Sequence, residues 1–437
     1  MKACIIGAGS SGIAAAQVLQ ARGIDYEWFE KGSQVGGNWR YENDNGMSSA
    51  YRSLHINTSR RVMAFKSLPM PEGYPDYPDH FQMAAYFDEV VDRYRLRDRI
   101  RFNAEVLDAR PVEGTGEWDV AVDGPEGEET NRYGAVLVAN GHHWDARWPE
   151  PAFPGADEFE GEQIHAHEYR EPDMLRGKRV LVLGIGNSAV DIAVESSRIG
   201  EKTFLATRRG AWVLPKYLNG KPIDEIANSV TGLAPIPVMR AVMQRQMKVA
   251  VGDPTDYGLP KPDHKLLEAH PTVSSEFLPR LGHGDITAKP NIDRFTGGRT
   301  VRFVDGTEEE IDLVVYCTGY KITFPFFRPE VLAAPDNKLP LYRRVVSVER
   351  PGLYFVGFIQ PLGPIMPLAE AQVEWIADLL SGRATLPSPA EMQKEIAVEE
   401  EKQRKRFVAS KRHTVEVDFY PYLREIRRER KRDSARA

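Results

Sequence analysis

One unit of this sequence occurs twice, and that repeat constrains the fold more than any other feature. Residues 5–12 read IIGAGSSG and residues 182–189 read VLGIGNSA, each after a strand-like apolar segment and before a helix-like one. A second pair, AVLVANG at 135–141 and LVVYCTG at 313–319, recurs at nearly the same offset. A glycine-rich turn between a strand and a helix is typical of the dinucleotide-binding βαβ unit. The sequence therefore predicts an α/β fold with two Rossmann-like domains.

The first glycine turn has the full fingerprint of such a unit. Gly7 permits the tight turn, Gly9 lets the backbone approach a pyrophosphate, and Gly12 lets the helix pack against the strand. Glu30 follows at the end of the next apolar segment, where a carboxylate can accept hydrogen bonds from ribose hydroxyls. Because an acid at this position repels a 2′-phosphate, the first site suits FAD.

The second turn keeps the spacing with Gly184 and Gly186, and Ala189 replaces the third glycine. At the offset where an acid is expected, the sequence has Arg208 and Arg209. Guanidinium groups bind a phosphate through paired hydrogen bonds, so the second site should prefer NADPH to NADH. We therefore expect a discontinuous FAD-binding domain over residues 1–169 and 285–437, and an NADPH-binding domain inserted at residues 170–284.

Composition excludes several other classes of protein. A chain of 437 residues with 42% hydrophobic and 27% charged residues is typical of a soluble globular protein, and its net charge of −6 argues against nucleic-acid binding. The sequence contains no run of about 18 apolar residues, so no membrane-spanning helix is predicted. Cys4 and Cys317 form no CxxC pair and are expected as buried, reduced thiols, which argues against a disulfide reductase. No metal site is expected, because His142-His143 and the pair His165 and His167 lack further ligands at a recognisable spacing. Oxygen or a quinone remains as the electron acceptor.

Four segments resemble a known family. Residues 159–169, FEGEQIHAHEY, match FxGxxxHxxxY, the identifying pattern of the flavin-containing monooxygenases. Residues 36–39 (GGNW) resemble the family's GGxW stretch, residues 54–65 its NTS segment, and residues 316–320 (YCTGY) its ATGY linker, with cysteine in place of alanine. The resemblance covers nearly the whole chain, with the motifs in the family's order.

The resemblance implies an activity. NADPH would reduce FAD, and oxygen would add to flavin C4a to give a hydroperoxide that transfers one oxygen atom to a soft nitrogen or sulfur nucleophile. The expected partners are a small amine or sulfide and molecular oxygen. Since the C-terminal membrane anchor of the animal members is missing, we expect a soluble, bacterial-type, cytoplasmic member; a homodimer is compatible with the sequence.

The resemblance also assigns residues. Asn57 is expected to act catalytically, as a neutral amide beside the flavin, while His165 and Tyr169 are expected to fix the junction of the domains and the position of NADP⁺. The helix that begins at Pro367 is expected to aim its N-terminus at the flavin. The expected cofactor-binding residues are Gly7, Gly9, Ser11, Gly12, Glu30, Lys31, Gly37, Asn38, Trp39, His55, Thr58, Gly184, Gly186, Asn187, Ser188, Arg208, Arg209, Thr318, Gly319 and Gln360.

Two other activities stay open. A Baeyer–Villiger monooxygenase would insert oxygen beside a ketone, but that group has tryptophan where this chain has Tyr169. A slow NADPH oxidase acting as a redox sensor is the other alternative, supported only by the basic end at residues 427–432, which we otherwise expect to be solvated.

Periodicity and composition predict the remaining elements. Residues 30–80 are expected to be mostly ordered loop, because they are rich in Gly, Pro, Asn and Ser. Strands are predicted at 100–103 and 118–122, and helices at 81–94, 237–250, 367–380 (amphipathic) and 391–408.

Overall fold

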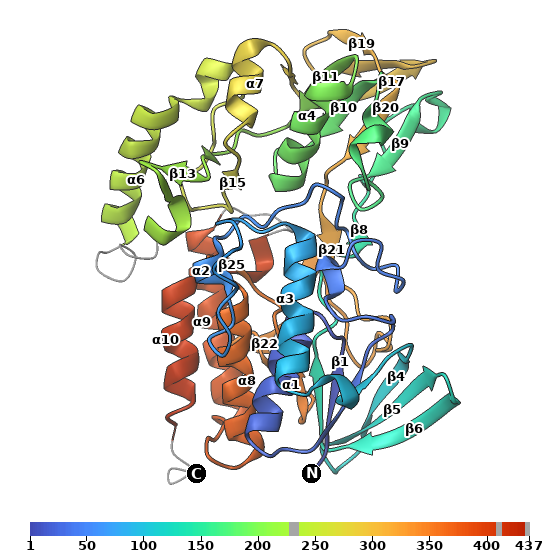
Figure 1. Ribbon diagram of the computed structural model, residues 1–437, viewed down its shortest axis with the longest axis vertical. Helices are drawn as coiled ribbons and strands as arrows, with labels where there is room; N and C mark the ends of the chain where they lie inside the picture. Colours follow the sequence, from blue (N-terminus) through green and yellow to red (C-terminus); the bar gives the residue numbers. More distant parts are fainter. Residues whose placement is uncertain (227–235, 408–412, 433–437) are drawn as a thin grey trace. The chain divides into compact units, whose positions relative to one another are not determined.

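The computed structural model describes residues 1–226, 236–407 and 413–432 (Figure 1). The chain divides into two compact units. Unit 1 comprises Met1–Ala50, Thr58–Asp145 and Lys321–Ala437, and unit 2 comprises Tyr51–Asn57 and Ala146–Tyr320. Each unit is built on its own mainly parallel sheet.

Unit 1 contains a seven-stranded sheet in the order β22-β23-β24-β7-β1-β2-β3. The strands β24, β7, β1, β2 and β3 are parallel, and β22 and β23 complete one edge in antiparallel pairing. The strands are β1 (Ala3–Ile6), β2 (Tyr26–Phe29), β3 (Ile100–Arg101), β7 (Ala135–Val138), β22 (Leu341–Tyr342), β23 (Val346–Ser347) and β24 (Leu353–Phe355). An antiparallel sheet of β4 (Glu105–Val112), β5 (Glu117–Gly124) and β6 (Gly127–Tyr133) is inserted between β3 and β7.

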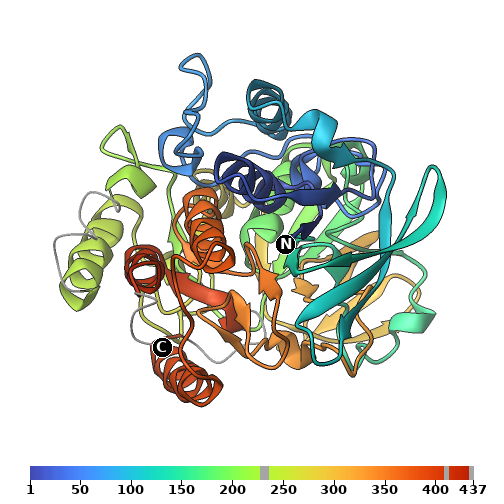
Figure 2. The ribbon, with the colours of Figure 1, turned by 90° about the horizontal axis from the view of Figure 1, so that it is seen from below.

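The helices of unit 1 include α1 (Ser10–Ala21), α2 (Arg60–Met63), α3 (His80–Arg93), α8 (Met366–Leu380), α9 (Pro389–Arg406) and α10 (Phe419–Glu429). Helix α8 packs against both α1 and α10, and the three lie side by side in Figure 2. It is buried almost all round, including Glu370, Gln372 and Asp378. The expected amphipathic helix is therefore a core helix, because α10 covers the face that the sequence pattern assigned to solvent.

Unit 2 contains a five-stranded sheet in the order β16-β11-β10-β20-β9, whose strands are all parallel. The strands are β9 (Glu162–His165), β10 (Arg179–Leu183), β11 (Lys202–Ala206), β16 (Thr287–Lys289) and β20 (Leu313–Tyr316). A second antiparallel sheet, β17 (Ile292–Gly297), β18 (Thr300–Phe303) and β19 (Glu308–Glu310), lies between β16 and β20 in the chain. The helices include α4 (Asn187–Ile199), α6 (Ile236–Val251) and α7 (Phe277–His283).

Short strands complete the two units. They are β8 (Asp145–Ala146), β12 (Val213–Leu214), β13 (Tyr217–Leu218), β14 (Lys221–Pro222), β15 (Thr272–Val273), β21 (Tyr320–Lys321), β25 (Gln360–Leu362) and β26 (Glu416–Asp418).

The sequence repeat is a repeat of the fold. Strands β3-β2-β1-β7-β24 of unit 1 correspond in order and direction to β16-β11-β10-β20-β9 of unit 2. In each unit the same backbone hydrogen bond fixes the glycine turn: Gly7 N–H donates to Phe29 O at 2.8 Å, and Gly184 N–H donates to Ala206 O at 2.9 Å. The predicted α/β fold with two Rossmann-like domains, one inserted in the other, is confirmed.

The boundaries between the two units fall at other residues than expected. Residues 146–169 and 285–320 lie in unit 2, because β9 and β20 pair in its sheet beside β10. Residues 51–57 also belong to unit 2, although the chain on both sides of them belongs to unit 1. The expected boundaries overlooked that 313–319 are part of the second copy of the repeat.

The predicted helices and strands agree with the structure more closely than the predicted domain boundaries do. The helices expected at 81–94, 237–250 and 367–380 are α3, α6 and α8, and the predicted strands are β3 and β5. The helix expected at 391–408 is α9, which ends at Arg406; residue 408 lies outside the described residues. The basic end is less solvated than expected, because Arg430 pairs with both Glu374 and Asp378 on α8. Cys4 is buried as expected, whereas Cys317 is only half-buried.

Candidate cofactor sites

The first glycine turn requires glycine at two positions, Gly7 and Gly12. Gly7 has a φ of +98°, and a Cβ on Gly12 would come within 1.9 Å of the Gly7 carbonyl oxygen. The Trp28 indole donates to the same carbonyl at 2.9 Å and holds it in place. Strand β1 and helix α1 can therefore approach as closely as a dinucleotide-binding turn requires.

Gly9 is different, because the protein itself does not demand a glycine there. Its backbone is extended, and a Cβ would only touch the Cα of Gly37 at 3.6 Å. Helix α1 begins at Ser10 with no side chain capping its first N–H groups. Free backbone donors beside an open space form a cradle for a phosphate group. These residues fit the pyrophosphate of FAD.

Glu30 is buried at the carboxyl end of β2, where its two oxygens accept three hydrogen bonds. The donors are Ala8 N–H at 2.7 Å, Gly32 N–H at 2.9 Å and the Asn45 amide at 2.9 Å. A carboxylate has about four acceptor positions. Glu30 therefore braces the turn and keeps about one position for a ribose hydroxyl. Asn45 was missed by sequence reasoning, because no spacing rule links it to Glu30.

The other expected residues of unit 1 surround this turn unevenly. Gly37 lies against Gly9, since a Cβ on Gly37 would be 2.9 Å from the Gly9 Cα. Asn38 accepts hydrogen bonds from Ser49 N–H at 2.9 Å and from the Ser49 hydroxyl at 2.8 Å, so its side chain fastens the loop. Lys31 is exposed and pairs with Glu105 at 2.9 Å. Half-buried positions are taken by Ser11, Trp39, Thr58 and Gln360.

The second turn repeats the geometry of the first. Gly184 has a φ of +135°, and a Cβ there would lie 2.8 Å from the Cys317 carbonyl oxygen. Helix α4 follows Gly186, again with no side chain capping its first turn. Ser188 is exposed on that turn, whereas the Asn187 amide oxygen accepts a hydrogen bond from Val273 N–H at 2.8 Å. The helix N-terminus fits a second pyrophosphate.

Thr318 and Gly319 follow β20 in unit 2, beside that turn in the sheet order. The Thr318 hydroxyl donates to the Arg147 carbonyl oxygen, and Arg147 N–H donates to the Gly319 carbonyl oxygen at 2.9 Å. These contacts fix the loop after β20.

The register of the repeat shows which residue replaces Glu30 in unit 2. Glu30 comes directly after Phe29 in β2, and the equivalent residue after Ala206 in β11 is Thr207. Thr207 is buried, and its hydroxyl donates to the Arg209 carbonyl oxygen at 2.8 Å. Arg208 comes one position later, where unit 1 has Lys31. The carboxylate that disfavours a 2′-phosphate is thus absent from this position. Thr207 was overlooked in the sequence, although it has the same spacing from its glycine turn as Glu30.

Both arginines of this loop are exposed. Arg209 lies 3.6 Å from a carboxylate oxygen of Asp263, whereas Arg208 has no ion pair within the described part of the chain. A guanidinium group without a protein carboxylate can turn toward a phosphate. The loop therefore fits the 2′-phosphate of NADPH.

We expect Arg208→Ala to raise the KM for NADPH about 10- to 150-fold and to change the KM for NADH little. The loss of about 1.5–3 kcal/mol is that of a charge-assisted hydrogen bond to the 2′-phosphate. Steady-state kinetics with both nucleotides measures it. Arg198→Ala removes an exposed guanidinium of α4 that pairs with Glu276, and should alter neither constant. Equal losses for the two nucleotides would contradict the role of Arg208.

His165 and Tyr169 both belong to unit 2, and their expected role in fixing the junction of the domains and NADP⁺ stays a prediction. Both are fully buried, and the Tyr169 hydroxyl donates to Glu195 on α4. His165 Nδ1 accepts a hydrogen bond from His167 N–H at 3.0 Å, and burial lowers the pKa of His165 to about 4. These residues build the core under the second turn.

The low pKa of His165 makes unit 2 sensitive to acid. The unfolded chain binds a proton near pH 6.5 that the folded protein excludes until about pH 4, so this histidine's contribution to stability is complete above pH 6.5 and is lost as the pH falls toward 4. In His165→Gln the free energy of unfolding should therefore fall less between pH 6.5 and pH 4, by up to about 3 kcal/mol. Denaturant unfolding at several pH values measures the difference, and parallel curves for the two proteins would contradict it.

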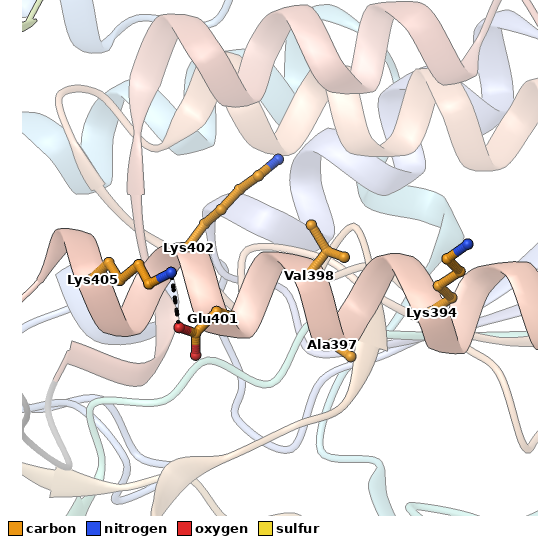
Figure 3. A pocket seen from close by; sticks show the side chains of 6 residues that line it. All are labelled: Lys394, Ala397, Val398, Glu401, Lys402 and Lys405. Atoms are coloured by element: carbon orange, nitrogen blue, oxygen red, sulfur yellow. Dashed lines mark ion pairs between the residues drawn. The ribbon is translucent and has the colours of Figure 1, made fainter.

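A shallow hollow also lies along the exposed face of α9 (Figure 3). Charged side chains line much of it, and Lys405 pairs with Glu401 at 3.1 Å. None of the expected site residues lies in this hollow. Its lining is Lys394, Ala397, Val398, Glu401, Lys402 and Lys405.

Taken by unit, the expected residues fall into two sets. Unit 1 holds the first turn with Glu30 and its loop, and unit 2 holds the second turn with Arg208 and Arg209, together with His55 and Asn57. One turn carries an acid and the other a threonine followed by two arginines. This combination defines the class of flavoproteins that bind FAD and NADPH on two separate Rossmann-like domains.

Comparison with known proteins identifies the family within that class. Residues 1–431 match the flavin-binding monooxygenase-like family, and the chain belongs to the flavin-containing monooxygenases. Flavin-containing monooxygenase 5 of Oryctolagus cuniculus is 37% identical over 442 residues, covering 97% of this chain and 82% of the relative. Dimethylaniline monooxygenase [N-oxide-forming] 2 of Rattus norvegicus is 34% identical, with the same coverage. The protein is thus an FAD-, NADPH- and oxygen-dependent monooxygenase.

Solved structures agree. S-allyl-L-cysteine S-oxygenase from Allium sativum aligns with a TM-score of 0.74 and 26% identity, covering 99% of this chain and 89% of that one. An open structure of cyclohexanone monooxygenase aligns with a TM-score of 0.71 at 22% identity, over 98% of this chain and 96% of that one, which shows a shared fold. The expectation of a bacterial-type member is not supported, since the curated relatives named above are mammalian. Among the described helices, none is both long and apolar enough to cross a bilayer.

Proposed function

We propose that this monooxygenase oxygenates small thioethers and tertiary amines, and that Asn57 assists the transfer. The observation that carries the proposal is the pair of glycine turns in one register, with Glu30 in one copy and Thr207 followed by Arg208 in the other. Two relatives support the class of substrate, because one is named for forming N-oxides and one for oxygenating the sulfur of S-allyl-L-cysteine.

Each set of residues would bind one cofactor. The N–H groups at the start of α1 would hold the FAD pyrophosphate, while Glu30 accepts a hydrogen bond from its ribose. The N-terminus of α4 would hold the pyrophosphate of NADPH, and Arg208 its 2′-phosphate. When bound, FAD takes a hydride from NADPH and supplies the activated oxygen.

Asn57 suits a site that must stabilise activated oxygen without adding charge. Its side chain is half-buried, and an amide both donates and accepts hydrogen bonds while staying neutral at every physiological pH. A neutral group adds no repulsion as negative charge develops on oxygen. The protein's further task is to exclude water, so that the activated oxygen meets the substrate before it is released as peroxide.

The proposal is tested by supplying NADPH and oxygen to the purified holoenzyme with one substrate at a time. The substrates are S-allyl-L-cysteine, N,N-dimethylaniline and cyclohexanone. We expect a sulfoxide or an N-oxide to account for most of the NADPH consumed. A lactone from cyclohexanone as the main product would favour the Baeyer–Villiger alternative. Hydrogen peroxide alone would make the protein an NADPH oxidase.

Location and assembly remain predictions of the sequence. A cytoplasmic location is an expectation from the sequence, and a homodimer is compatible with it. Cell fractionation and light scattering of the purified protein would test them directly.

A further inference from the structure

The segment from Tyr51 to Asn57 is a short excursion of the chain from unit 1 into unit 2. Asn57 is its last residue, and Thr58 already belongs to unit 1. Whatever fastens this segment therefore determines where the Asn57 amide lies. The contacts that do so come from unit 2.

Two hydroxyl groups attach the segment to helix α4. The Tyr51 hydroxyl donates to Asp191 Oδ2 at 2.6 Å, and the Ser53 hydroxyl donates to Glu195 Oε1. Between them, Arg52 N–H donates to the Arg170 carbonyl oxygen at 2.7 Å. The attachment thus combines two hydroxyl hydrogen bonds to carboxylates of α4 with one backbone hydrogen bond, and the exposed Arg52 guanidinium adds a hydrogen bond to Glu171 at 3.4 Å.

A second tyrosine reinforces the attachment. Tyr169 donates its hydroxyl to Glu195 Oε2, so both oxygens of that carboxylate accept hydrogen bonds from hydroxyls. The Tyr169 ring lies 5.6 Å from the Tyr51 ring, and both tyrosines are buried. Tyr169 belongs to the family's identifying pattern, and this contact gives that position a physical role.

The position of Asp191 and Glu195 on α4 is energetically unfavourable for both carboxylates. Asp191 and Glu195 are four residues apart on α4, so they share one face of the helix and repel each other when both are ionised. Burial raises the pKa of Asp191 to about 6. The charged or titratable groups around Asp191 are Tyr51, His55, Tyr169, Glu195, Lys216 and Cys317. Since apolar side chains of similar volume often replace buried charged groups without loss of stability, packing does not require two carboxylates on this face.

We propose that Asp191 and Glu195 are positioning residues for oxygen transfer, which through Tyr51 and Ser53 hold Asn57 on the helix that begins at the NADPH-binding turn. The inference rests on the proposed role of Asn57. Its consequence is that the amide and the bound NADP⁺ belong to one rigid part of the protein, since both are carried by α4. Retained NADP⁺ and Asn57 then keep their relative positions during turnover.

The test is a double variant, Tyr51→Phe with Ser53→Ala, in the FAD-loaded enzyme. We expect amide hydrogen exchange over residues 52–57 to become about tenfold faster or more, because two hydrogen bonds to carboxylates are lost. The KM for NADPH and the rate of flavin reduction should stay unchanged. The fraction of NADPH that gives oxygenated product should fall about tenfold, with hydrogen peroxide making up the difference.

Two further variants separate positioning from a general loss of stability. Tyr133→Phe removes another buried tyrosine hydroxyl that donates to a carboxylate, Glu27 of unit 1, and should leave the product yield unchanged. Ser53→Thr keeps a hydroxyl and should keep the wild-type yield.

Three results would overturn the inference. They are unchanged exchange in the double variant, faster exchange with an unchanged product yield, and an equal loss of yield in Tyr133→Phe. A wild-type enzyme that releases only peroxide would instead overturn the proposed function, and the role of the two carboxylates with it.

Discussion

Asn57→Asp is expected to turn the monooxygenase into an enzyme that consumes NADPH and releases hydrogen peroxide. The substitution replaces a neutral amide by a carboxylate of the same size in a half-buried position. Like charges in a partly desolvated site repel each other by several kcal/mol, so the negative charge that develops on oxygen is disfavoured there. Oxygenated product per NADPH should fall at least about 100-fold, as a loss of about 3 kcal/mol requires.

The measurement is the ratio of oxygenated product to peroxide, with FAD content read from the visible absorbance. FAD binding and NADPH consumption should stay close to wild type, because Asn57 lies in neither glycine turn. Asn103→Asp makes the same chemical change at an exposed loop position and serves as the control. If Asn57→Asp oxygenated thioethers at the wild-type rate, Asn57 would be a structural loop residue.

Gly9→Ala should give a folded protein that lacks FAD. The backbone of Gly9 is one that alanine adopts, and the added methyl group makes ordinary contacts with the backbone of Gly37, at 3.6 Å from its Cα and 3.9 Å from its nitrogen. The protein should therefore keep its stability, while the methyl group occupies the space where the pyrophosphate approaches the backbone. Overlap of about 3 kcal/mol would weaken FAD binding about 100-fold. Absorbance near 450 nm and circular dichroism together measure loading and folding.

Two matched variants sharpen this prediction. Gly12→Ala places a methyl group 1.9 Å from the Gly7 carbonyl oxygen, so it should lose both FAD and stability. Gly186→Ala alters the other turn and should give a yellow protein that NADPH reduces slowly. Exchanged phenotypes for Gly9→Ala and Gly186→Ala would mean that the cofactors are assigned to the wrong units.

The sequence predicts those parts of the fold that depend on neighbours in the chain. A turn such as Gly7 to Gly12 is visible because backbone geometry and a close approach restrict each position. The burial of α8 was not predictable, because α10, which covers it, comes about 40 residues later and leaves no mark on the pattern of α8 itself.

The site shows the same division. The glycines of the second copy follow the spacing rule and lie at the turn, whereas the two arginines follow Thr207 after strand β11. Thr207 was missed because attention fell on the charged side chain of Arg208, one position too far along the chain, although Thr207 has the same spacing from its glycine turn as Glu30; the backbone hydrogen bonds fix that register. The partners Asn45, Asp191 and Glu195 come from distant segments, which no local pattern links to the residues they hold.

The shared register of the two copies also bears on how the molecule arose. Five parallel strands in the same spatial order, an antiparallel sheet inserted at the equivalent point and the same hydrogen bond at the glycine turn form the pattern that duplication of an ancestral domain produces. After duplication, the copies diverged most consequentially at the two positions that follow their second strand, Glu30-Lys31 and Thr207-Arg208. On the proposed role of Arg208, the choice of electron donor is a modular property: evolution, or an engineer, can change it at one loop of one copy while the rest of the scaffold stays untouched.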